Sequence, residues 1–341
     1  MKRVKIIDRK KPWFQLALVL LLPVFFFAFR LKKDLSTKAG GPRLEDFLIT
    51  VPSEETPSQS VECELNNDKF AFFVHQNASD DLVSQKILAD GFPYCDRQLV
   101  SLITSCVTCF KAECVFLDIG SNIGSCAILA GLLGARVLAF EVVKENAALG
   151  ARNVFANDLR DKVSIFNVGL GNKNEQVALY KLHGNKGHNM VGRFQERLRD
   201  EYTHTDGFVV RLDDVIEELE NYLGSRKIIH VIMVDAEGYE NEILKGAWKA
   251  LRHFELQTIY FQFSPHLMGF DAAQELLESM DKNSFEIYPE IGDNGGTRGI
   301  PLNMDGMITY SHPSGFAFWD FLAKKKGLEL PWSPPSCSLV L

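Results

Sequence analysis

The sequence predicts an α/β protein with a doubly wound, mostly parallel sheet behind a single N-terminal transmembrane helix. Three observations lead to this prediction. Residues 115–141 contain one complete unit of strand, glycine turn, helix and strand. From residue 144 to residue 263, helical segments continue to alternate with short apolar runs, as in a parallel sheet with helices on its faces. Residues 13–29 form an apolar run without a single charge.

The uncharged run, WFQLALVLLLPVFFFAF, is just long enough to span a bilayer. Residues 1–12 before it are strongly basic, and positive charge favours the cytosolic side. A cleavable signal peptide is the alternative, but it would have small residues after the apolar core, where this chain has Phe29-Arg30-Leu31-Lys32. We therefore expect a retained anchor in a single-pass type II membrane protein, with a lumenal domain in the Golgi or endoplasmic reticulum.

The predicted anchor divides the chain into a cytosolic tail at 1–12, a stem at 30–60, a globular domain at 61–330 and an irregular tail at 331–341. Pro, Gly, Ser, Thr and Glu dominate the stem, which offers too little apolar surface to fold. Overall, 46% hydrophobic and 24% charged residues are typical of globular proteins. The formal net charge of −7, without a basic stripe, argues against a nucleic-acid partner.

All seven cysteines lie on the predicted lumenal side, where disulfides form. We expect Cys126, inside a predicted helix, to be free and buried, and the other six to form three bridges in any of 15 connectivities. Cys106 and Cys109 have the C-x-x-C spacing of a redox or zinc motif, but without a second such pair a structural bridge is the better interpretation. Asn77-Ala78-Ser79 is an N-glycosylation sequon.

The central unit follows a predicted strand at 70–74 and a predicted helix at 96–110. Residues 115–119 form an apolar run, broken only by Asp118, that suits a strand buried on both faces. The sequence Gly-Ser-Asn-Ile-Gly at 120–124 then predicts a tight turn. A helix at 125–133 and a second strand at 137–140 follow, and Glu141 closes that strand.

This unit places Asp118, the glycine turn and Glu141 at the edge where open α/β sheets bind ligands. Glu141 lies 23 positions after Asp118, close to the roughly 20-residue spacing of the carboxylate that holds a ribose in dinucleotide folds. The turn is G-x-x-x-G, however, and lacks the G-x-G-x-x-G pattern that lets the backbone approach a pyrophosphate. A nucleoside cofactor without phosphate therefore fits the turn better.

Four segments carry a resemblance to a known family: VFLDIGSNIG at 115–124, AFEVVKENAALGARNVFAND at 139–158, VGLGNKN at 168–174, and VVRLDDVI at 209–216 leading to VIMVDAEGYENEILKGA at 231–247. In this order and spacing they resemble the FkbM-type family of class I S-adenosylmethionine-dependent methyltransferases, over residues 114–263. The sequence departs from the family at Val142, where many members have proline, and at Gln262, where members often have an acid.

The resemblance implies a Rossmann-like class I methyltransferase fold for residues 61–330, S-adenosylmethionine as the cofactor and methylation of a hydroxyl. Together with the lumenal placement, it suggests a glycan or other secretory-pathway acceptor. The resemblance assigns no metal ligand. The residues it implies for the cofactor are Asp118, Gly120, Ser121, Asn122, Gly124, Glu141 and Asp235.

Downstream of Glu141, the sequence predicts helices at 144–157, 215–223, 241–251 and 270–280, and strands at 163–168, 176–180, 209–212, 228–234, 258–263, 285–288 and 316–319. Residues 181–193, KLHGNKGHNMVGR, are polar and rich in glycine and predict a loop. This loop is either solvated or covers the cofactor and presents His183 and His188 to a substrate.

Three residues at the predicted ligand edge are the catalytic candidates. Asp235 and Glu237 follow an apolar strand, and the D-x-E-G motif of the family aligns with them and with Gly238. His266 follows the next strand and is a candidate general base, because an imidazole titrates near about pH 6.5. The alternatives are a surface role for His266, a helix cap at Asp235, a divalent-cation site in a metal-dependent glycosyltransferase, and a non-catalytic, membrane-tethered interaction module.

Overall fold

The computed structural model describes residues 42–51, 56–182, 189–191, 202–291, 297–298 and 319–330. The chain divides into two compact units, Met1–Pro42 and Arg43–Leu341, and the description below concerns the second. The predicted cytosolic tail, the anchor at 13–29 and the tail at 331–341 lie outside the described residues. Among the described helices, none is both long and apolar enough to cross a membrane.

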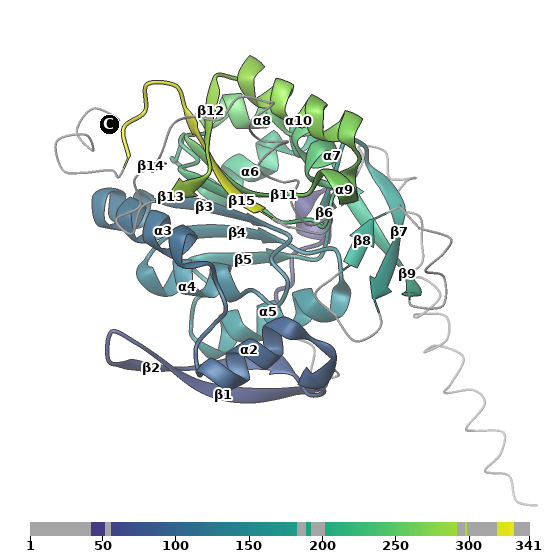
Figure 1. Cartoon of the computed structure of the whole chain (residues 1–341). Coiled ribbons are helices and arrows are strands. Elements are labelled where there is room, and N and C mark those ends of the chain that lie inside the picture. The colour runs from purple at the N-terminus through teal and green to yellow at the C-terminus, as the bar shows by residue number, and fades with distance from the viewer. Residues whose placement is uncertain are drawn as a thin grey trace, which may run out of the picture. The chain divides into compact units, whose positions relative to one another are not determined.

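A seven-stranded sheet forms the centre of the domain, in the order β12-β15-β11-β10-β3-β4-β5 (Figure 1). Its strands are β3 (Val115–Ile119), β4 (Arg136–Phe140), β5 (Val163–Phe166), β10 (Val231–Val234), β11 (Thr258–Phe263), β12 (Phe285–Tyr288) and β15 (Trp319–Lys325). Strands β5, β4, β3, β10 and β11 pair in parallel, whereas β15 runs antiparallel to both β11 and β12. The predicted mostly parallel α/β sheet is confirmed.

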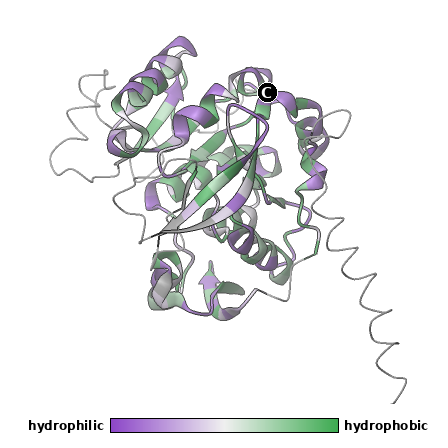
Figure 2. Cartoon of the chain, turned by 90° about the vertical axis from the view of Figure 1, so that its right-hand side faces the viewer, coloured by the Kyte–Doolittle hydropathy of each residue, from purple (hydrophilic) through white to green (hydrophobic). Residues whose placement is uncertain are grey.

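Helices lie against both faces of this sheet (Figure 1). One group is α3 (Arg97–Phe110), α4 (Ser125–Leu133) and α5 (Lys144–Ala156). The other is α6 (Ile216–Leu223), α7 (Glu240–Lys245), α8 (Trp248–His253) and α10 (Phe270–Lys282), with the short α9 (Pro265–Met268) after β11. Because both faces are covered, every residue of β3 and β5 is buried, and the strands of the sheet are largely apolar in Figure 2.

Three smaller sheets accompany the central one among the described residues, and the smallest of them is given in the next paragraph. An N-terminal hairpin joins β1 (Ser58–Leu65) to β2 (Asp68–His75), followed by α2 (Leu82–Asp90). The side chain of Asn153 on α5 holds this hairpin, because it accepts a hydrogen bond from Phe73 N at 2.6 Å and donates one to Phe73 O at 3.1 Å. The second sheet contains β6 (Gly169–Leu170), β7 (Glu175–Leu182), β8 (Asn189–Val191) and β9 (Tyr202–Val210), in the order β6-β9-β7-β8.

Short elements complete the described chain: the 3-10 helices η2 (Leu44–Asp46), η3 (Ala78–Asp80), η4 (Lys111–Glu113) and η6 (Leu212–Asp214), and the paired strands β13 (Glu290–Ile291) and β14 (Thr297–Arg298). The first of them corrects the predicted stem. Leu44 is fully buried, Ile49 N donates to Ile165 O at 3.0 Å, and Asn167 N donates to Phe47 O at 2.9 Å. The domain therefore begins near Arg43, because a few apolar residues in a polar stretch pair with the edge strand β5.

Of the predicted strand 316–319, only Trp319 lies among the described residues, and it opens β15, which continues to Lys325. Three further expectations differ from the structure. The helix predicted at 241–251 is two helices that break at Gly246, where a Cβ would lie 1.9 Å from Gly171 O. Strand β9 begins earlier than predicted. Within the predicted loop at 181–193, β8 pairs with β7, while His183 and His188 lie outside the described residues.

The disulfides also correct the sequence prediction. Cys126 is bonded to Cys95, and Cys106 is bonded to Cys114. Cys109 is disulfide-bonded as well, whereas Cys63 is a buried free thiol. The expectation that Cys126 is free was wrong because it considered only its place on α4, and the segment before α3 comes close to that helix only in the folded chain.

Candidate functional site

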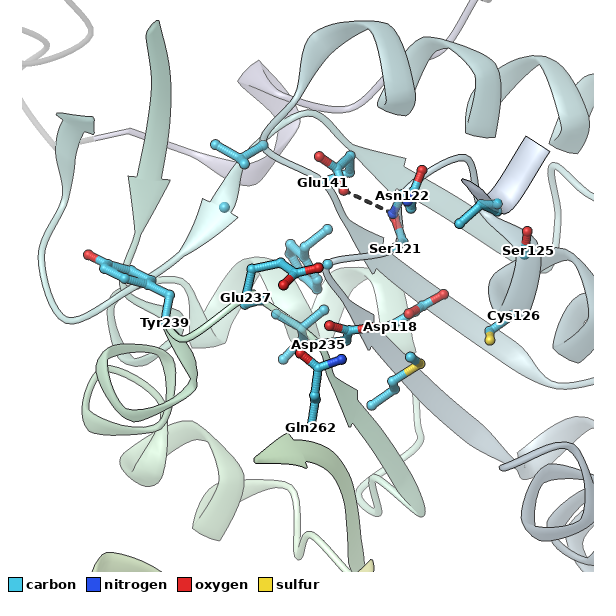
Figure 3. A pocket seen from close by; sticks show the side chains of 18 of the residues that line it. Asp118, Ser121, Asn122, Ser125, Cys126, Glu141, Asp235, Glu237, Tyr239 and Gln262 are labelled. Atoms are coloured by element: carbon cyan, nitrogen blue, oxygen red, sulfur yellow. Dashed lines mark hydrogen bonds between the residues drawn. The ribbon is translucent and has the colours of Figure 1, made fainter. Parts of the chain in front are cut away.

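A cavity of about 470 Å³ opens at the carboxyl ends of β3, β4 and β10 (Figure 3). This is the edge at which the sequence predicted ligand binding. The cavity brings together most of the predicted site residues, namely Asp118, Gly120, Ser121, Asn122, Glu141, Asp235 and Glu237. Gly124 and His266 are not among the residues that line it.

Glu141 ties the end of β4 to the glycine turn. Its Oε2 accepts a hydrogen bond from Asn122 N at 2.9 Å (Figure 3). Its Oε1 accepts one from Val143 N at 2.7 Å. The side chain is only 6% exposed, so these bonds hold it in one orientation. A carboxylate offers about four acceptor positions, so the same group can also hold hydroxyls of a bound ligand.

The two glycines of the turn have different roles. Gly120 adopts a φ of +84°, and a Cβ there would lie 1.8 Å from Asp235 O. Only glycine therefore lets the turn after β3 approach the chain after β10 this closely. Gly124 also has a φ of +84° but faces Gly150 Cα, so it serves the start of α4 and its packing on α5.

Several buried polar atoms beside the turn have no hydrogen-bond partner. They are Oδ2 of Asp118 and the hydroxyl oxygens of Ser121 and Ser125, all on side chains at most 6% exposed. Burial and the charge of Glu141 raise the pKa of Asp118 to about 7. Unsatisfied buried polar groups are costly, and a ligand that carries positive charge and hydrogen-bond donors would satisfy these. The site therefore fits S-adenosylmethionine, which has a sulfonium, an ammonium and ribose hydroxyls.

The turn after β10 is held in a left-handed conformation by a residue that the sequence analysis missed. Glu237 and Gly238 have φ values of +51° and +94°. Oε1 of Glu240 accepts hydrogen bonds from Ala236 N at 3.0 Å and from Gly238 N at 3.1 Å. Glu240 is 1% exposed, and burial raises its pKa to about 7. By holding the backbone on either side of Glu237, it fixes the positions of Asp235 and Glu237.

Asp235 is the centre of the negative charge in the cavity. Burial first, and then the carboxylates of Glu237, Asp320, Glu240 and Asp118, raise its pKa well above the ordinary range. The alternative that Asp235 only caps a helix does not hold. Helix α7 has Tyr239 as its N-cap residue, without a side-chain hydrogen bond at the cap. Asp235 and Glu237 both line the cavity (Figure 3).

His266 lies apart from these acids. It belongs to α9, which starts at Pro265 directly after β11, and its ring packs edge-on against Phe270 at a centroid distance of 5.6 Å. The cavity instead reaches Asp96, Tyr260, Gln262 and Asp320, of which the sequence analysis named only Gln262 and gave it no role. Among the described residues, no group of three or more His, Cys, Asp or Glu side chains could hold a metal ion.

Three of the solved structures that match this chain are methyltransferases of low sequence identity. An O-methyltransferase from Bacillus cereus in complex with SAH is 14% identical, with 73% of this chain and 91% of that chain covered and a TM-score of 0.36. The METTL16 methyltransferase domain is 15% identical, with 78% and 86% covered and a TM-score of 0.37. The 16S rRNA N2 G1207 methyltransferase of T. thermophilus, in complex with AdoMet and guanosine, is 10% identical, with 80% and 52% covered and a TM-score of 0.35.

No curated protein matches the sequence. Residues 118–287 match the family described as "Methyltransferase FkbM domain". This segment begins at Asp118 and contains the glycine turn, Glu141, Asp235 and Glu237, so the match covers the predicted cofactor site and most of the central sheet. The chain therefore belongs, through residues 118–287, to the FkbM family of S-adenosylmethionine-dependent methyltransferases.

Proposed function

We propose that this protein transfers a methyl group from S-adenosylmethionine to a hydroxyl of a glycan or another acceptor of the secretory pathway. The observation that carries the proposal is one cavity in which the glycine turn and Glu141 meet the carboxylates of Asp235 and Glu237. The first pair suits the nucleoside of the cofactor, and the second suits chemistry at the acceptor.

Each part of the site has a role in holding the cofactor. Glu141 would hold the ribose hydroxyls, and the backbone of residues 120–122 would lie beside the nucleoside. Asp118 or Asp235 would hold the positively charged amino-acid end of the cofactor. When bound, S-adenosylmethionine supplies an electrophilic methyl group.

The protein's contribution to the reaction is mainly to position the acceptor, which accounts for a large share of the rate of such transfers. A carboxylate of the cavity would take the proton of the acceptor hydroxyl, whose oxygen would receive the methyl group. Asp235 is the proposed base because it lines the cavity and its raised pKa makes it a stronger base than an ordinary aspartate. Glu237 lines the same part of the cavity, whereas His266 does not.

The secretory location is part of this proposal. The disulfides Cys95–Cys126 and Cys106–Cys114 support it, because structural disulfides form in oxidising compartments. The sequon asparagine, Asn77, is exposed and so accessible to glycosylation. The basic segment at 1–12 and the uncharged run at 13–29 support a type II anchor in the Golgi or endoplasmic reticulum.

Calorimetric titration of the full chain, purified in mild detergent, with S-adenosylmethionine and with SAH tests the proposal. Glu141→Ala serves as the comparison, and a uridine diphosphate sugar with manganese serves as the control for a glycosyltransferase. We expect micromolar binding of both compounds that is lost in the variant, followed by transfer of tritiated methyl to glycan hydroxyls. A folded chain that binds neither compound would overturn the proposal, and so would a manganese-dependent response to the nucleotide sugar alone.

A further inference from the structure

The cavity has a second wall that the cofactor roles above do not use. It is formed by Asp96 before α3, by Tyr260 and Gln262 on β11, and by Asp320 on β15. Tyr260 and Gln262 project to the same side of β11, since side chains alternate along a strand. Asp320 is the cross-strand partner of Gln262 in the antiparallel pair of β11 and β15. We call these four residues the acceptor wall.

Asp96 is fixed in place from two directions. Its Oδ1 accepts hydrogen bonds from Gln98 N at 2.8 Å and from Leu99 N at 3.4 Å, so it caps α3. The residue before it, Cys95, is bonded to Cys126 on α4, the helix that follows the glycine turn. The disulfide therefore joins the acceptor wall to the cofactor-binding turn, and both cysteines line the cavity.

Tyr260 stands between two carboxylates. Its side chain is 2% exposed, and burial first, and then the nearby carboxylates of Asp320 and Asp96, raise its pKa. A phenol has one proton and can donate to only one carboxylate at a time. Asp96 already accepts two backbone N–H groups at the start of α3, so Asp320 is the better placed of the two to accept a donor from a ligand. Although Asp320 is exposed at the cavity, partial desolvation and the charge of Asp96 raise its pKa to about 6.

Other atoms of the cavity also lack donors. Oδ2 of Asp118, on a side chain only 1% exposed, and Oε1 of Gln262 are buried without a hydrogen-bond partner. Among the described residues that line the cavity, six are acidic and one, Lys86, is basic. The ammonium of Lys86 lies 3.7 Å from the centre of the Tyr94 ring. This balance favours ligand groups that donate hydrogen bonds and disfavours anions.

We propose that the acceptor wall binds a neutral sugar, with Asp320 and Tyr260 accepting and donating hydrogen bonds to hydroxyls next to the one that is methylated, and that it excludes anionic acceptors. This inference rests on the proposed methyl transfer. A sugar supplies several adjacent donors, whereas a cationic amine would be placed next to the sulfonium and repelled by it. Tyr94 is 46% exposed at the cavity and offers an aromatic surface for the apolar face of a sugar ring.

The test uses the full chain with tritiated S-adenosylmethionine and three oligosaccharide pools released from secreted glycoproteins. One pool is neutral, one carries sialic or uronic acids, and one carries free amines after removal of N-acetyl groups. We expect the neutral pool to be labelled at a rate at least about tenfold higher than the other two pools. The reason is that losing one good hydrogen bond to the acceptor lowers the rate by about that factor. Preferred labelling of the acidic or the amine pool overturns the inference.

Two variants test the roles of Asp320 and Tyr260 in binding the acceptor. Asp320→Asn and Tyr260→Phe should raise KM for the neutral pool about tenfold or more, with a smaller change in kcat and an unchanged Kd for SAH. Asp271→Asn, an exposed aspartate on α10 that does not line the cavity, is the matched control and should change none of these. Thermal unfolding shows whether each variant is folded.

The failure of this inference is distinguishable from that of the proposed function. If the wild-type chain does not bind SAH, the methyltransferase proposal fails. If SAH binds normally but no pool is labelled, or if both variants keep the wild-type KM, the neutral-sugar wall is overturned while the cofactor site stands.

Discussion

The cofactor side and the acceptor wall of the cavity differ in how their polar groups are satisfied. On the cofactor side, both oxygens of Glu141 accept backbone N–H groups from nearby residues, and the turn is set before any ligand arrives. On the acceptor wall, Tyr260 is buried beside the carboxylates of Asp96 and Asp320, and Oε1 of Gln262 is buried without a hydrogen-bond partner. The backbone of the first side is thus set by local contacts, although Asp118 there also has an oxygen without a partner. The second side brings together residues from distant segments, and this is the difference that the following variants test.

Gly120→Ala should have the largest effect. The new Cβ would lie 1.8 Å from Asp235 O at a φ of +84°, so β3 and β10 must separate at their carboxyl ends. We expect about 4 kcal/mol of lost stability and SAH binding too weak to detect. Gly327→Ala is the matched control, because it has a φ of +82° but no atom within 4 Å of the new Cβ, and should cost about 1–2 kcal/mol without a change in SAH binding. Calorimetry measures SAH binding and thermal unfolding measures stability in both variants. Equal losses in the two variants would show that the left-handed φ, and not the clash with Asp235 O, causes the effect.

Replacing Cys95 and Cys126 together by serine should remove the covalent link between the acceptor wall and the cofactor side of the cavity. The bridge closes 31 residues, for which chain entropy predicts about 3–4 kcal/mol of stability. Because it also positions Asp96, we expect a severalfold rise in KM for the acceptor. The control is the pair Cys106 and Cys114, which closes 8 residues away from the cavity and should cost about 2–3 kcal/mol with KM unchanged. A higher KM in both double variants would contradict a specific role for the cavity bridge.

The same contrast explains what the sequence could predict. The cofactor side comes from one contiguous stretch, residues 115–141, in which strand, turn, helix and acid follow each other at a regular spacing. Short-range patterns of this kind specify local structure, and the parallel sheet follows from their repetition. The cofactor residues Asp118, Gly120 and Glu141 could therefore be found without a structure.

The acceptor wall carries no such pattern. Asp96, Tyr260 and Asp320 are far apart in the chain and meet only because β15 inserts between β11 and β12. Tyr260 also lies within an apolar strand, where an aromatic residue predicts only core packing. Similarly, His266 was a plausible base from its distance to a strand end, but the short helix α9 places it outside the cavity.

Through Glu240, which holds the turn after β10, the stability of the protein should depend on pH. Burial raises its pKa from 4.5 to about 7, so between these values the folded protein holds a proton that the unfolded chain has lost. Stability should therefore fall as pH rises from about 4.5 to about 7, by up to roughly 3 kcal/mol from this residue, and level off above. Glu240→Gln keeps an acceptor for Ala236 N and Gly238 N and should flatten the fall, as measured by urea unfolding across this range.

The pKa of Asp118 is also raised to about 7, so part of the fall in stability with rising pH should remain in the Glu240→Gln variant. Glu217→Gln, at an exposed position on α6, is the control, and its stability should depend on pH as strongly as that of the wild-type protein. A variant at Glu240 with the same slope as the wild-type protein would show that this carboxyl is already ionised in the folded state.

Glu141→Gln is the smallest and most specific change on the cofactor side. A glutamine offers only one oxygen, so its amide nitrogen must face either Asn122 N or Val143 N, and that one backbone donor loses its acceptor. Hydrogen bonds to charged groups contribute about 1.5–3 kcal/mol, so we expect SAH binding weakened about 10- to 100-fold and stability lowered by about 2 kcal/mol. In a chain that turns over, kcat/KM for the acceptor at saturating cofactor should stay near the wild-type value, because the proposed contacts to the acceptor come from Tyr260 and Asp320. If Glu141→Gln instead raised KM for the acceptor while SAH affinity held, the cavity would be used in the opposite sense, with the carboxylate of β4 facing the acceptor and the Tyr260 wall facing the cofactor.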